Sequence, residues 1–362
     1  MKLIIFAGGA GTRLWPISRN STPKQFDKLF NGKSTIQLAV DRVRDLWGIE
    51  NIYISTNKKF KDIILEQLPD LPVNNLILEP ERRDVAAAIL LSFLQLKSEG
   101  YLGEVGILWA DHLMDRVDSF QSSLKTSEIL IKKNQDKFIY FGERPRFANH
   151  NLGWINFGKE VCFENGQTVR QFLGWKYRPE LKECEKMFRS NDWYWNTGYF
   201  ITTIKFVVGL YKQFMPDMYK TLSKVFDLYG TDKFEPELAK VYPTIESISF
   251  DNAIVEKTKP SDALVLVNDF GWSDPGTLYS LKEALEESNS SNVTKGEVYN
   301  YQSEDCLVMN YEDNKLVTTI GLKGFVVVNT EDALVVVHKD DVPKVKELVG
   351  ELKKEDNLKK YT

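Results

Sequence analysis

Short apolar runs alternate with helical patterns through the first 145 residues, and this alternation constrains the fold more than any other feature of the chain. The runs are rich in β-branched and aromatic residues, as strands buried on both faces of a sheet are: "KLIIFA", "NIYIST", "NLILE", "VGILWA" and "FIYFGE". Between them the spacing of apolar residues predicts helices over 34–47, 58–68, 84–97 and 117–134. Such alternation predicts an α/β fold with a doubly wound, mostly parallel sheet.

The start of the first predicted helix has a sequence signature of its own. Ser34 and Gln37 have the spacing of a capping box, in which each side chain accepts a hydrogen bond from the backbone N–H of the other residue. We therefore expect this helix to begin at Ser34.

Residues 150–275 show another pattern, which we assign to a substrate-facing half of the same domain. "LGWINFG" and "TVRQFLGW" predict antiparallel strands, and helices are expected over 179–189 and 205–229. A further helix over 276–288 leads into the polar segment "SNSSN".

Five short strands and a charged helix over 341–355 follow that polar segment and predict a small, separate all-β unit. We therefore expect a domain of residues 1–288 and a domain of residues 289–362. In the first domain, residues 1–145 are expected to bind a nucleotide and residues 146–288 its co-substrate.

Composition and charge narrow the class of protein. The 362 residues carry a net charge of −4, which argues against a protein that binds nucleic-acid backbones. Cys162, Cys184 and Cys306 form no CxxC pair and the chain has 3 histidines, so neither a disulfide framework nor a zinc site is expected. No apolar run reaches the roughly 18 residues of a membrane helix, and we expect a soluble, cytoplasmic protein.

The segment "FAGGAGTRLWPISRNSTPKQF" (6–26) follows the first predicted strand. Gly8, Gly9 and Gly11 allow backbone N–H groups to approach an anion closely. Arg13 and Lys24 add positive charge, and this combination suits a triphosphate whose charge shifts during cleavage. The alternative is a flexible surface turn with solvated basic side chains.

Two other phosphate-binding loops do not match this segment. A Walker A loop ends in Gly-Lys-Ser/Thr, whereas Gly11 is followed by Thr12 and Arg13. A dinucleotide-binding loop needs a third glycine where Leu14 stands, and an acidic residue at the end of the second strand, which "NIYIST" lacks.

The segment resembles the GG-x-G-T-R-LWP…PKQF signature of the sugar-1-phosphate nucleotidylyltransferases. Its Leu-Trp-Pro and Pro-Lys-Gln-Phe parts are most similar to the guanylyltransferases that act on mannose 1-phosphate, and the similarity extends through the whole chain. The resemblance implies catalytic roles for Arg13 and Lys24. It implies nucleotide binding by Gly8, Gly9, Gly11 and Thr12.

Two aspartates are candidate metal ligands. Asp111 follows the apolar strand "VGIL", where a carboxylate can hold Mg²⁺ against phosphate oxygens, and Asp274 lies in "FGWSDPGTL". For both the alternative is a helix cap, and Asp274 followed by Pro275 is typical of one. Their segments resemble the family's PADH and GWSDLG motifs, whose aspartates bind Mg²⁺, and this resemblance favours the metal.

"EPERRDVAAAI" (79–89) resembles the family's base-binding motif EPxxRNTAPAI, which implies nucleotide contacts by Glu79, Arg83 and Asp84. Guanine presents two N–H donors side by side, so a carboxylate such as Glu79 or Asp84 is a suitable acceptor. The alternative for the alanine-rich part is a helix face in the core.

Four further residues match sugar-binding segments of the family. Gly153 in "NLGWINFG", Asn196 in "WYWNTGYF" and Asp251 in "SISFDNAIVEK" are implied to approach the hexose, and a helix cap is the alternative for Asp251. Lys176 aligns with the lysine of the family's F-x-EKP motif, which binds the sugar phosphate. Trp175 stands where that motif has a glutamate, and two residues separate Lys176 from Pro179. Either the sugar pocket is rebuilt or other residues contact the hexose.

The resemblance implies Mg²⁺-dependent transfer of GMP from GTP to mannose 1-phosphate, giving GDP-mannose and pyrophosphate. The tail of the chain resembles the family's short left-handed β-helical domain, and the unpaired backbone at the open end of such a coil favours a homodimer through this domain. Two alternatives stay open: the same chemistry with another base or sugar, such as glucose 1-phosphate with dTTP or UTP, and a catalytically silent sensor of nucleotide sugars.

Overall fold

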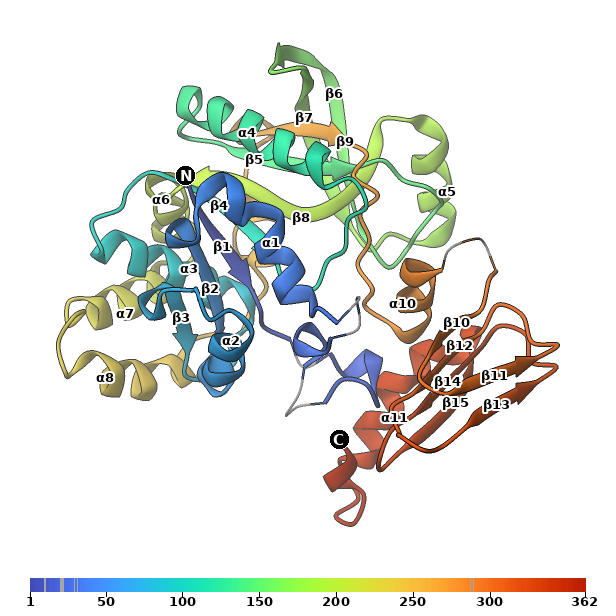
Figure 1. Ribbon diagram of the computed structural model, residues 1–362. Helices are drawn as coiled ribbons and strands as arrows, with labels where there is room; N and C mark the ends of the chain where they lie inside the picture. Colours follow the sequence, from blue (N-terminus) through green and yellow to red (C-terminus); the bar gives the residue numbers. More distant parts are fainter. Residues whose placement is uncertain (10, 20–22, 29, 31, 287, 289) are drawn as a thin grey trace. The chain divides into compact units, whose positions relative to one another are not determined.

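The computed structural model describes residues 1–9, 11–19, 23–28, 30, 32–286, 288 and 290–362 (Figure 1). Within these residues the chain forms two compact units. The first unit comprises Met1–Gly8, Ala39–Ala110 and Met114–Trp272. The second unit comprises Gly9–Leu38, Asp111–Leu113 and Ser273–Thr362.

The first unit is built on a sheet that has nine strands among the described residues, in the order β3-β2-β1-β4-β8-β5-β9-β7-β6. Strands β7 and β8 run against the others, so the sheet is mixed and mostly parallel, as predicted. The strands are β1 (Lys2–Phe6), β2 (Ile52–Asn57), β3 (Leu76–Glu79), β4 (Glu104–Trp109), β5 (Phe138–Glu143), β6 (Gly153–Glu164), β7 (Gln167–Tyr177), β8 (Trp193–Thr203) and β9 (Ala263–Asn268).

β1 is buried through its centre and has a strand on either side. β1 pairs in parallel with β2 on one side and with β4 on the other, and Leu3, Ile4 and Ile5 are fully buried. A strand with apolar side chains on both faces is stable only where helices cover both faces. β1, whose apolar side chains point to both faces, therefore lies inside the sheet, whereas the apolar strand β3 forms one edge.

Helices cover the two faces of this sheet. Consecutive strand residues point to opposite faces, and Tyr140 and Phe200 pack in the core that includes α3 (Asp84–Ser98). Their neighbours Phe141 and Tyr199 lie on the other face, where Phe120 of α4 (Val117–Lys133) contacts both rings. The remaining helices of the first unit are α2 (Lys61–Gln67), α5 (Leu181–Ser190), α6 (Ile204–Phe214), α7 (Pro216–Phe226), α8 (Phe234–Val241) and α9 (Phe250–Ala253).

The structure confirms the first predicted helix and corrects a later one. α1 (Thr35–Trp47) begins after the expected capping box, in which Ser34 N–H donates to Gln37 Oε1 over 3.0 Å and Gln37 N–H donates to Ser34 Oγ over 3.4 Å. The helix expected over 205–229 is wrong: α6 ends at Phe214 and α7 starts at Pro216, because proline lacks the N–H that a continuous helix requires. β8, α8, α9 and β9 were not predicted. No helix in the described part of the chain is long and apolar enough to cross a bilayer.

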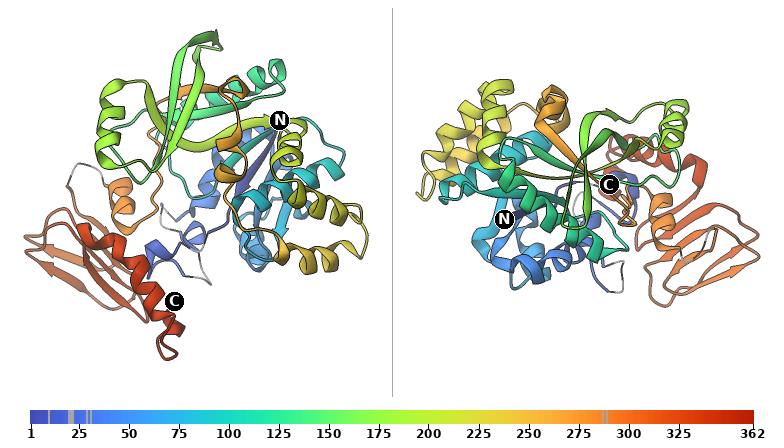
Figure 2. Two further views of the ribbon diagram at one scale, coloured as in Figure 1. Left: turned by 180° about the vertical axis from the view of Figure 1, so that it is seen from behind. Right: turned by 90° about the horizontal axis from the view of Figure 1, so that it is seen from above.

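The long β6–β7 hairpin confirms the expected antiparallel pair. It extends beyond the rest of the sheet in both Figure 1 and Figure 2. In the strand order, β8 and β9 lie between β4 and β7. The strands of residues 150–275 therefore join the same sheet as β1 to β5 and do not form a separate layer.

The C-terminal part of the second unit is a short β-helix-like domain. β10 (Val293–Lys295), β12 (Leu307–Asn310) and β14 (Phe325–Asn329) stack in parallel, and β15 (Leu334–His338) adds to them in antiparallel fashion. β11 (Val298–Tyr301) and β13 (Val317–Ile320) form a second parallel pair. β10 to β14 thus add alternately to two sheets, an arrangement that agrees with the β-helical domain implied by the resemblance.

Two helices pack on these strands. α10 (Leu278–Leu285) precedes them, and α11 (Val345–Leu352) lies against one face of the larger sheet in both views (Figures 1 and 2). α11 is shorter than the helix predicted over 341–355, because a 3₁₀ turn over Lys339–Lys344 precedes it. The domain boundary expected at residue 288 stays a prediction, and part of "SNSSN" lies outside the described residues.

Candidate active site

A backbone bridge brings the two predicted metal ligands together. Leu113 N–H donates to the Ser273 carbonyl over 3.0 Å, and Ser273 N–H donates to the Leu113 carbonyl over 3.1 Å. Asp111 lies two residues before this antiparallel bridge and Asp274 lies directly after it. The two carboxylates, far apart in the sequence, therefore belong to one site in the second unit.

The ammonium group of Lys24 lies between these carboxylates. Its Nζ is 2.9 Å from Asp111 Oδ2 and 3.7 Å from Asp274 Oδ1, and it donates to the Pro275 carbonyl over 3.4 Å. Arg13 lies beside this group, since a Cβ built on Gly276 would be 3.3 Å from Arg13 Nη2 and 3.4 Å from Asp274 Oδ1. The structure thus brings together all four residues predicted to be catalytic.

The charges of this cluster stabilise each other. Burial by itself would lower the pKa of Lys24, but Asp111 and then Asp274 outweigh burial, and the pKa lies above its ordinary value. Burial by itself would raise the pKa of Asp111, but Lys24 and then His112 lower it to about 2. Lys24 and Asp111 are therefore charged at neutral pH.

The glycine-rich loop holds Lys24 through Ser18. The Ser18 hydroxyl accepts a hydrogen bond from Lys24 N–H over 3.0 Å. Gly11 has a φ of +56°, and a Cβ at this position would lie 2.2 Å from Ser18 Oγ, so only glycine fits. A Cβ on Gly8 or Gly9 would meet no atom of the described residues within 4 Å, its own chain neighbours aside, which leaves the backbone there open to a ligand.

The helix-cap alternative fails for both aspartates. The N-cap of α10 is Thr277, whose hydroxyl accepts from Ser280 N–H over 3.1 Å. The N-cap position of α4 is Arg116, well after Asp111. Neither carboxylate therefore caps these helices.

The residues predicted to bind the base lie in the first unit, at the end of β3 and the start of α3. Glu79 is buried and accepts a hydrogen bond from the Tyr242 hydroxyl over 2.7 Å. Burial raises the pKa of Glu79 to about 7. Asp84 is exposed, and its carboxylate accepts a hydrogen bond from Val85 N–H over 2.7 Å. Arg83 forms an ion pair in which its Nη2 lies 3.5 Å from Glu81 Oε1.

Three of the residues predicted to bind the sugar also lie in the first unit, on β6, β7 and β8. A Cβ built on Gly153 would be 3.4 Å from the Cβ of Asn196 and 3.7 Å from the Lys176 carbonyl oxygen, so the three residues are neighbours. The Lys176 ammonium forms an ion pair with Glu183 of α5. Glu183 was not expected as its partner.

Asp251 lies apart from these three residues, within α9. Burial is the main cause that raises its pKa to about 6, and Asp84 is among the nearby charges that add to the rise. The N-cap of α9 is Ser249, which accepts from Asn252 N–H over 3.2 Å, so the cap alternative for Asp251 is wrong.

Glu143 at the end of β5 is a buried carboxylate that the sequence analysis did not single out. Its buried carboxylate accepts from Phe270 N–H over 2.8 Å and from Trp272 N–H over 3.1 Å, and both guanidinium Nη atoms of Arg146 donate to the Trp272 carbonyl over 3.1 Å. Burial raises the pKa of Glu143 to about 7. These contacts hold the backbone of Phe270 and Trp272 against the end of β5. The signal was a carboxylate at the carboxyl end of a buried strand, the same pattern that singled out Asp111.

Known proteins resemble this chain along its whole length. The family described as "Nucleotidyl transferase" matches residues 2–291, and the family "MannoseP isomerase/GMP-like beta-helix domain" matches residues 296–352. Mannose-1-phosphate guanylyltransferase of Escherichia coli is 31% identical over 96% of this chain and 75% of its own length. Alginate biosynthesis protein AlgA of Pseudomonas syringae pv. tomato is 31% identical over 96% of this chain and 71% of its own length.

A solved structure agrees with the fold. The crystal structure of mannose-1-phosphate geranyltransferase from Thermus thermophilus has a TM-score of 0.84 and 26% identity, and the match covers 97% of this chain and 99% of that one. Both domains of this chain therefore have counterparts in known proteins. The chain belongs to the nucleotidyl transferase family, and it is a nucleotidyltransferase with a C-terminal β-helix domain.

Proposed function

We propose that the protein transfers GMP from GTP to mannose 1-phosphate and releases pyrophosphate, giving GDP-mannose. The observation that carries this proposal is the position of the Lys24 ammonium between Asp111 and Asp274, with Arg13 beside them. The choice of substrates is supported by the relatives named mannose-1-phosphate guanylyltransferase, which are similar over nearly the whole chain.

The reaction needs positioning and neutralisation of charge rather than a covalent enzyme intermediate. A phosphate oxygen of mannose 1-phosphate attacks the α-phosphorus of GTP in line, and the bond from that phosphorus to the bridging β-phosphate oxygen breaks. Pyrophosphate leaves with the electron pair of that bond. Arg13 and Lys24 stabilise the negative charge that develops on it, while the backbone around Gly8, Gly9 and Gly11 holds the triphosphate.

Asp111 and Asp274 would hold Mg²⁺. The donor set fits this ion, since both carboxylates already face one cation, the Lys24 ammonium, at 2.9 and 3.7 Å. No cluster of three or more His, Cys, Asp or Glu side chains gathers within the described ranges, and Mg²⁺ is commonly bound through one or two carboxylates together with substrate phosphates and water. When bound, the ion would neutralise phosphate charge and hold the reacting groups in line.

The proposed base and sugar contacts lie in the first unit. Asp84, with an exposed carboxylate, is the more accessible acceptor for the two guanine N–H groups, whereas Glu79 is buried against Tyr242. Arg83 and Thr12 complete the proposed nucleotide contacts. Lys176 would bind the sugar phosphate after releasing Glu183.

Gly153 and Asn196 would lie against the hexose. Gly153 offers a surface without a side chain, and the amide of Asn196 can donate to a hydroxyl while its Oδ1 accepts from Gly198 N–H over 3.0 Å. Asp251 would act on a hydroxyl or support these contacts from α9.

A homodimer through the C-terminal domain is part of the proposal. Tyr299 and Tyr301 of β11 and Ile320 of β13 are 61%, 51% and 70% exposed, and they share a sheet face because residues two apart on a strand point the same way. An apolar face of this kind is expected to be covered by a second copy. Sedimentation should show a dimer for the wild type and a monomer for Ile320→Glu.

A panel of substrates tests the function. Pyrophosphate release should be fastest with GTP and mannose 1-phosphate, compared with ATP, dTTP and UTP and with glucose 1-phosphate. A faster pair would assign the same chemistry to another base or sugar. Nucleotide-sugar binding without turnover of any pair would assign a silent sensor instead.

A further inference from the structure

The signature loop is packed on the C-terminal β-helix domain. We define the loop as residues 11–19 and 23–28, and its side chains Leu14, Trp15 and Ile17 are buried in the same core as Val326 of β14 and Val345 of α11. The second unit accordingly contains both Gly9–Leu38 and Ser273–Thr362. The loop that we expect to bind the nucleotide therefore packs on the domain that we expect to form the dimer.

Arg19 anchors the middle of the loop. Its Nη1 donates to Asp332 Oδ2 and to the Tyr361 carbonyl, both over 2.9 Å, and its Nη2 donates to Asp332 Oδ1 over 2.5 Å and to Thr330 Oγ1 over 3.4 Å. Nε donates to the Pro16 carbonyl over 3.3 Å. All five guanidinium N–H groups thus have acceptors, and the fork on one carboxylate fixes the orientation of the side chain.

Asp27 anchors the end of the loop. Its Oδ2 accepts from the Tyr311 hydroxyl over 3.2 Å, and its Oδ1 lies 3.9 Å from Lys295 Nζ. Lys295, at the end of β10, also lies 4.0 Å from the centre of the Tyr311 ring, which follows β12. Both partners belong to the β-helix, and Lys24 lies between the two anchored residues of the loop.

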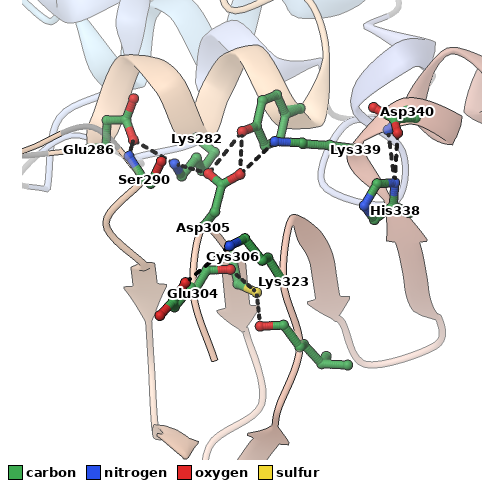
Figure 3. A network of polar contacts seen from close by, with 12 residues as sticks. Lys282, Glu286, Ser290, Glu304, Asp305, Cys306, Lys323, His338, Lys339 and Asp340 are labelled. Atoms are coloured by element: carbon green, nitrogen blue, oxygen red, sulfur yellow. Dashed lines mark hydrogen bonds and ion pairs between the residues drawn. The ribbon is translucent and has the colours of Figure 1, made fainter. Parts of the chain in front are cut away.

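A third anchor acts on the segment that carries Asp274. Asp305, between β11 and β12, accepts from Lys282 Nζ over 2.6 Å, from Lys339 Nζ over 2.8 Å and from the Tyr279 hydroxyl over 2.9 Å (Figure 3). Lys282 and Tyr279 are residues of α10, which begins shortly after Asp274. The β-helix domain therefore anchors two segments of the ion-pair cluster: the loop that carries Lys24 and the helix that follows Asp274.

We propose that the β-helix domain positions the active site, with Asp332 and Tyr311 as positioning residues that hold Lys24 in place through Arg19 and Asp27. This inference rests on the function proposed for Lys24. A charged group stabilises a transition state only when it is held in the right place, and a misplacement of about 1 Å can lower the rate about 100-fold. The anchors supply that placement without touching substrate.

The test uses full-length Asp332→Asn and Tyr311→Phe, with Glu304→Gln as the matched control. Glu304 is adjacent to Asp305 in the same domain, but its ion pair with Lys323 is exposed (Figure 3). No contact described for the Glu304 carboxylate joins it to the defined loop residues or to α10. Hydrogen exchange of the loop amides and steady-state kinetics of pyrophosphate release are measured for each. Asp332→Glu, which keeps the carboxylate, serves as the rescue variant.

We expect loop amides to exchange roughly 10-fold faster in Asp332→Asn and Tyr311→Phe, with strands β12 and β14 unchanged. kcat should fall about 10-fold with KM for the sugar phosphate within about twofold, because Lys24 acts on the transition state. Asp332→Glu should recover most of the rate, and Glu304→Gln should match the wild type.

Two results would overturn the inference. One is unchanged loop exchange and unchanged kcat in both variants, and the other is faster exchange of β12 and β14 along with the loop, which would mean general loosening. If the wild type releases no pyrophosphate with any substrate, the proposed function fails, and loop exchange still decides whether the anchors hold the loop.

Discussion

Asp305 is a buried carboxylate. We expect its replacement by the neutral side chain of asparagine to lower the stability of the fold by an amount that depends on pH. Its side chain is 6% exposed, and it contacts two ammonium groups, one of which, Lys282, is 1% exposed. Asp305→Asn keeps the size of the side chain and removes its charge. Lys282 would then keep only Glu286, at 2.5 Å, as a charged partner among the contacts described.

The magnitude follows from the pKa of Asp305. Burial by itself would raise this pKa, but hydrogen bonds from Lys282, Lys339 and Tyr279 lower it from 3.8 to about 2. At roughly 1.4 kcal/mol per pKa unit, the folded state favours the charged carboxylate by about 2 kcal/mol. We expect Asp305→Asn to lower the free energy of unfolding of the second unit by about this amount at pH 7.

The sign of the pH dependence follows from the lowered pKa. The folded-state pKa lies below the unfolded value, so the stabilisation is complete above pH 3.8 and is lost as the pH falls through about 2. At a pH of about 3, roughly half of it should remain. The difference between wild type and Asp305→Asn should therefore shrink on acidification.

Urea unfolding followed by hydrogen exchange of β12 and β14 reports on the second unit by itself. Glu304→Gln is the control, because its ion pair with Lys323 has both side chains more than 70% exposed and should change stability by less than about 0.5 kcal/mol. A difference for Asp305→Asn that is equal at neutral and at acidic pH, or no larger than that of the control, would refute the reasoning.

Three further predictions concern the site. Asp111→Asn should lower kcat by a factor of about 1000 or more with little change in thermal unfolding, and near wild-type turnover would remove Asp111 from the mechanism. Arg13→Ala should also lower kcat, measured as pyrophosphate release; a change only in KM for the sugar phosphate would contradict its assigned role. Glu79 has a pKa raised to about 7, so its contribution to stability is present below its unfolded value and is lost as the pH rises through about 7. The side-chain oxygen of Glu79→Gln can still accept from Tyr242. The free energy of unfolding of this variant, relative to wild type, should therefore rise between about pH 5 and about pH 9. A difference in urea midpoint between variant and wild type that is the same at both pH values would count against a buried, neutral Glu79.

Local patterns in the sequence determined much of the fold. The apolar runs predicted the parallel strands, and Ser34 and Gln37 predicted the start of α1, because strand burial and helix capping depend on residues close together in the chain. Pro216 was a local signal for a helix start, but the prediction joined α6 and α7 into one helix.

Candidate site residues were predictable only as separate positions. A carboxylate after a buried strand singled out Asp111, but a helix cap remained open for Asp111 and for Asp274. The structure excluded it by placing Arg116 and Thr277 at the starts of α4 and α10. Their common site depends on the bridge between Leu113 and Ser273, which joins segments far apart in the sequence.

Sequence alone thus determined which segments form strands and helices and which side chains have the right chemistry. Only the tertiary structure decided that Lys24 lies between two carboxylates and that the loop carrying it packs on the β-helix rather than standing free. The physical reason is that periodicity and capping act over a few residues. Ion pairs, strand bridges and a shared apolar core join residues whose separation along the chain leaves no local pattern.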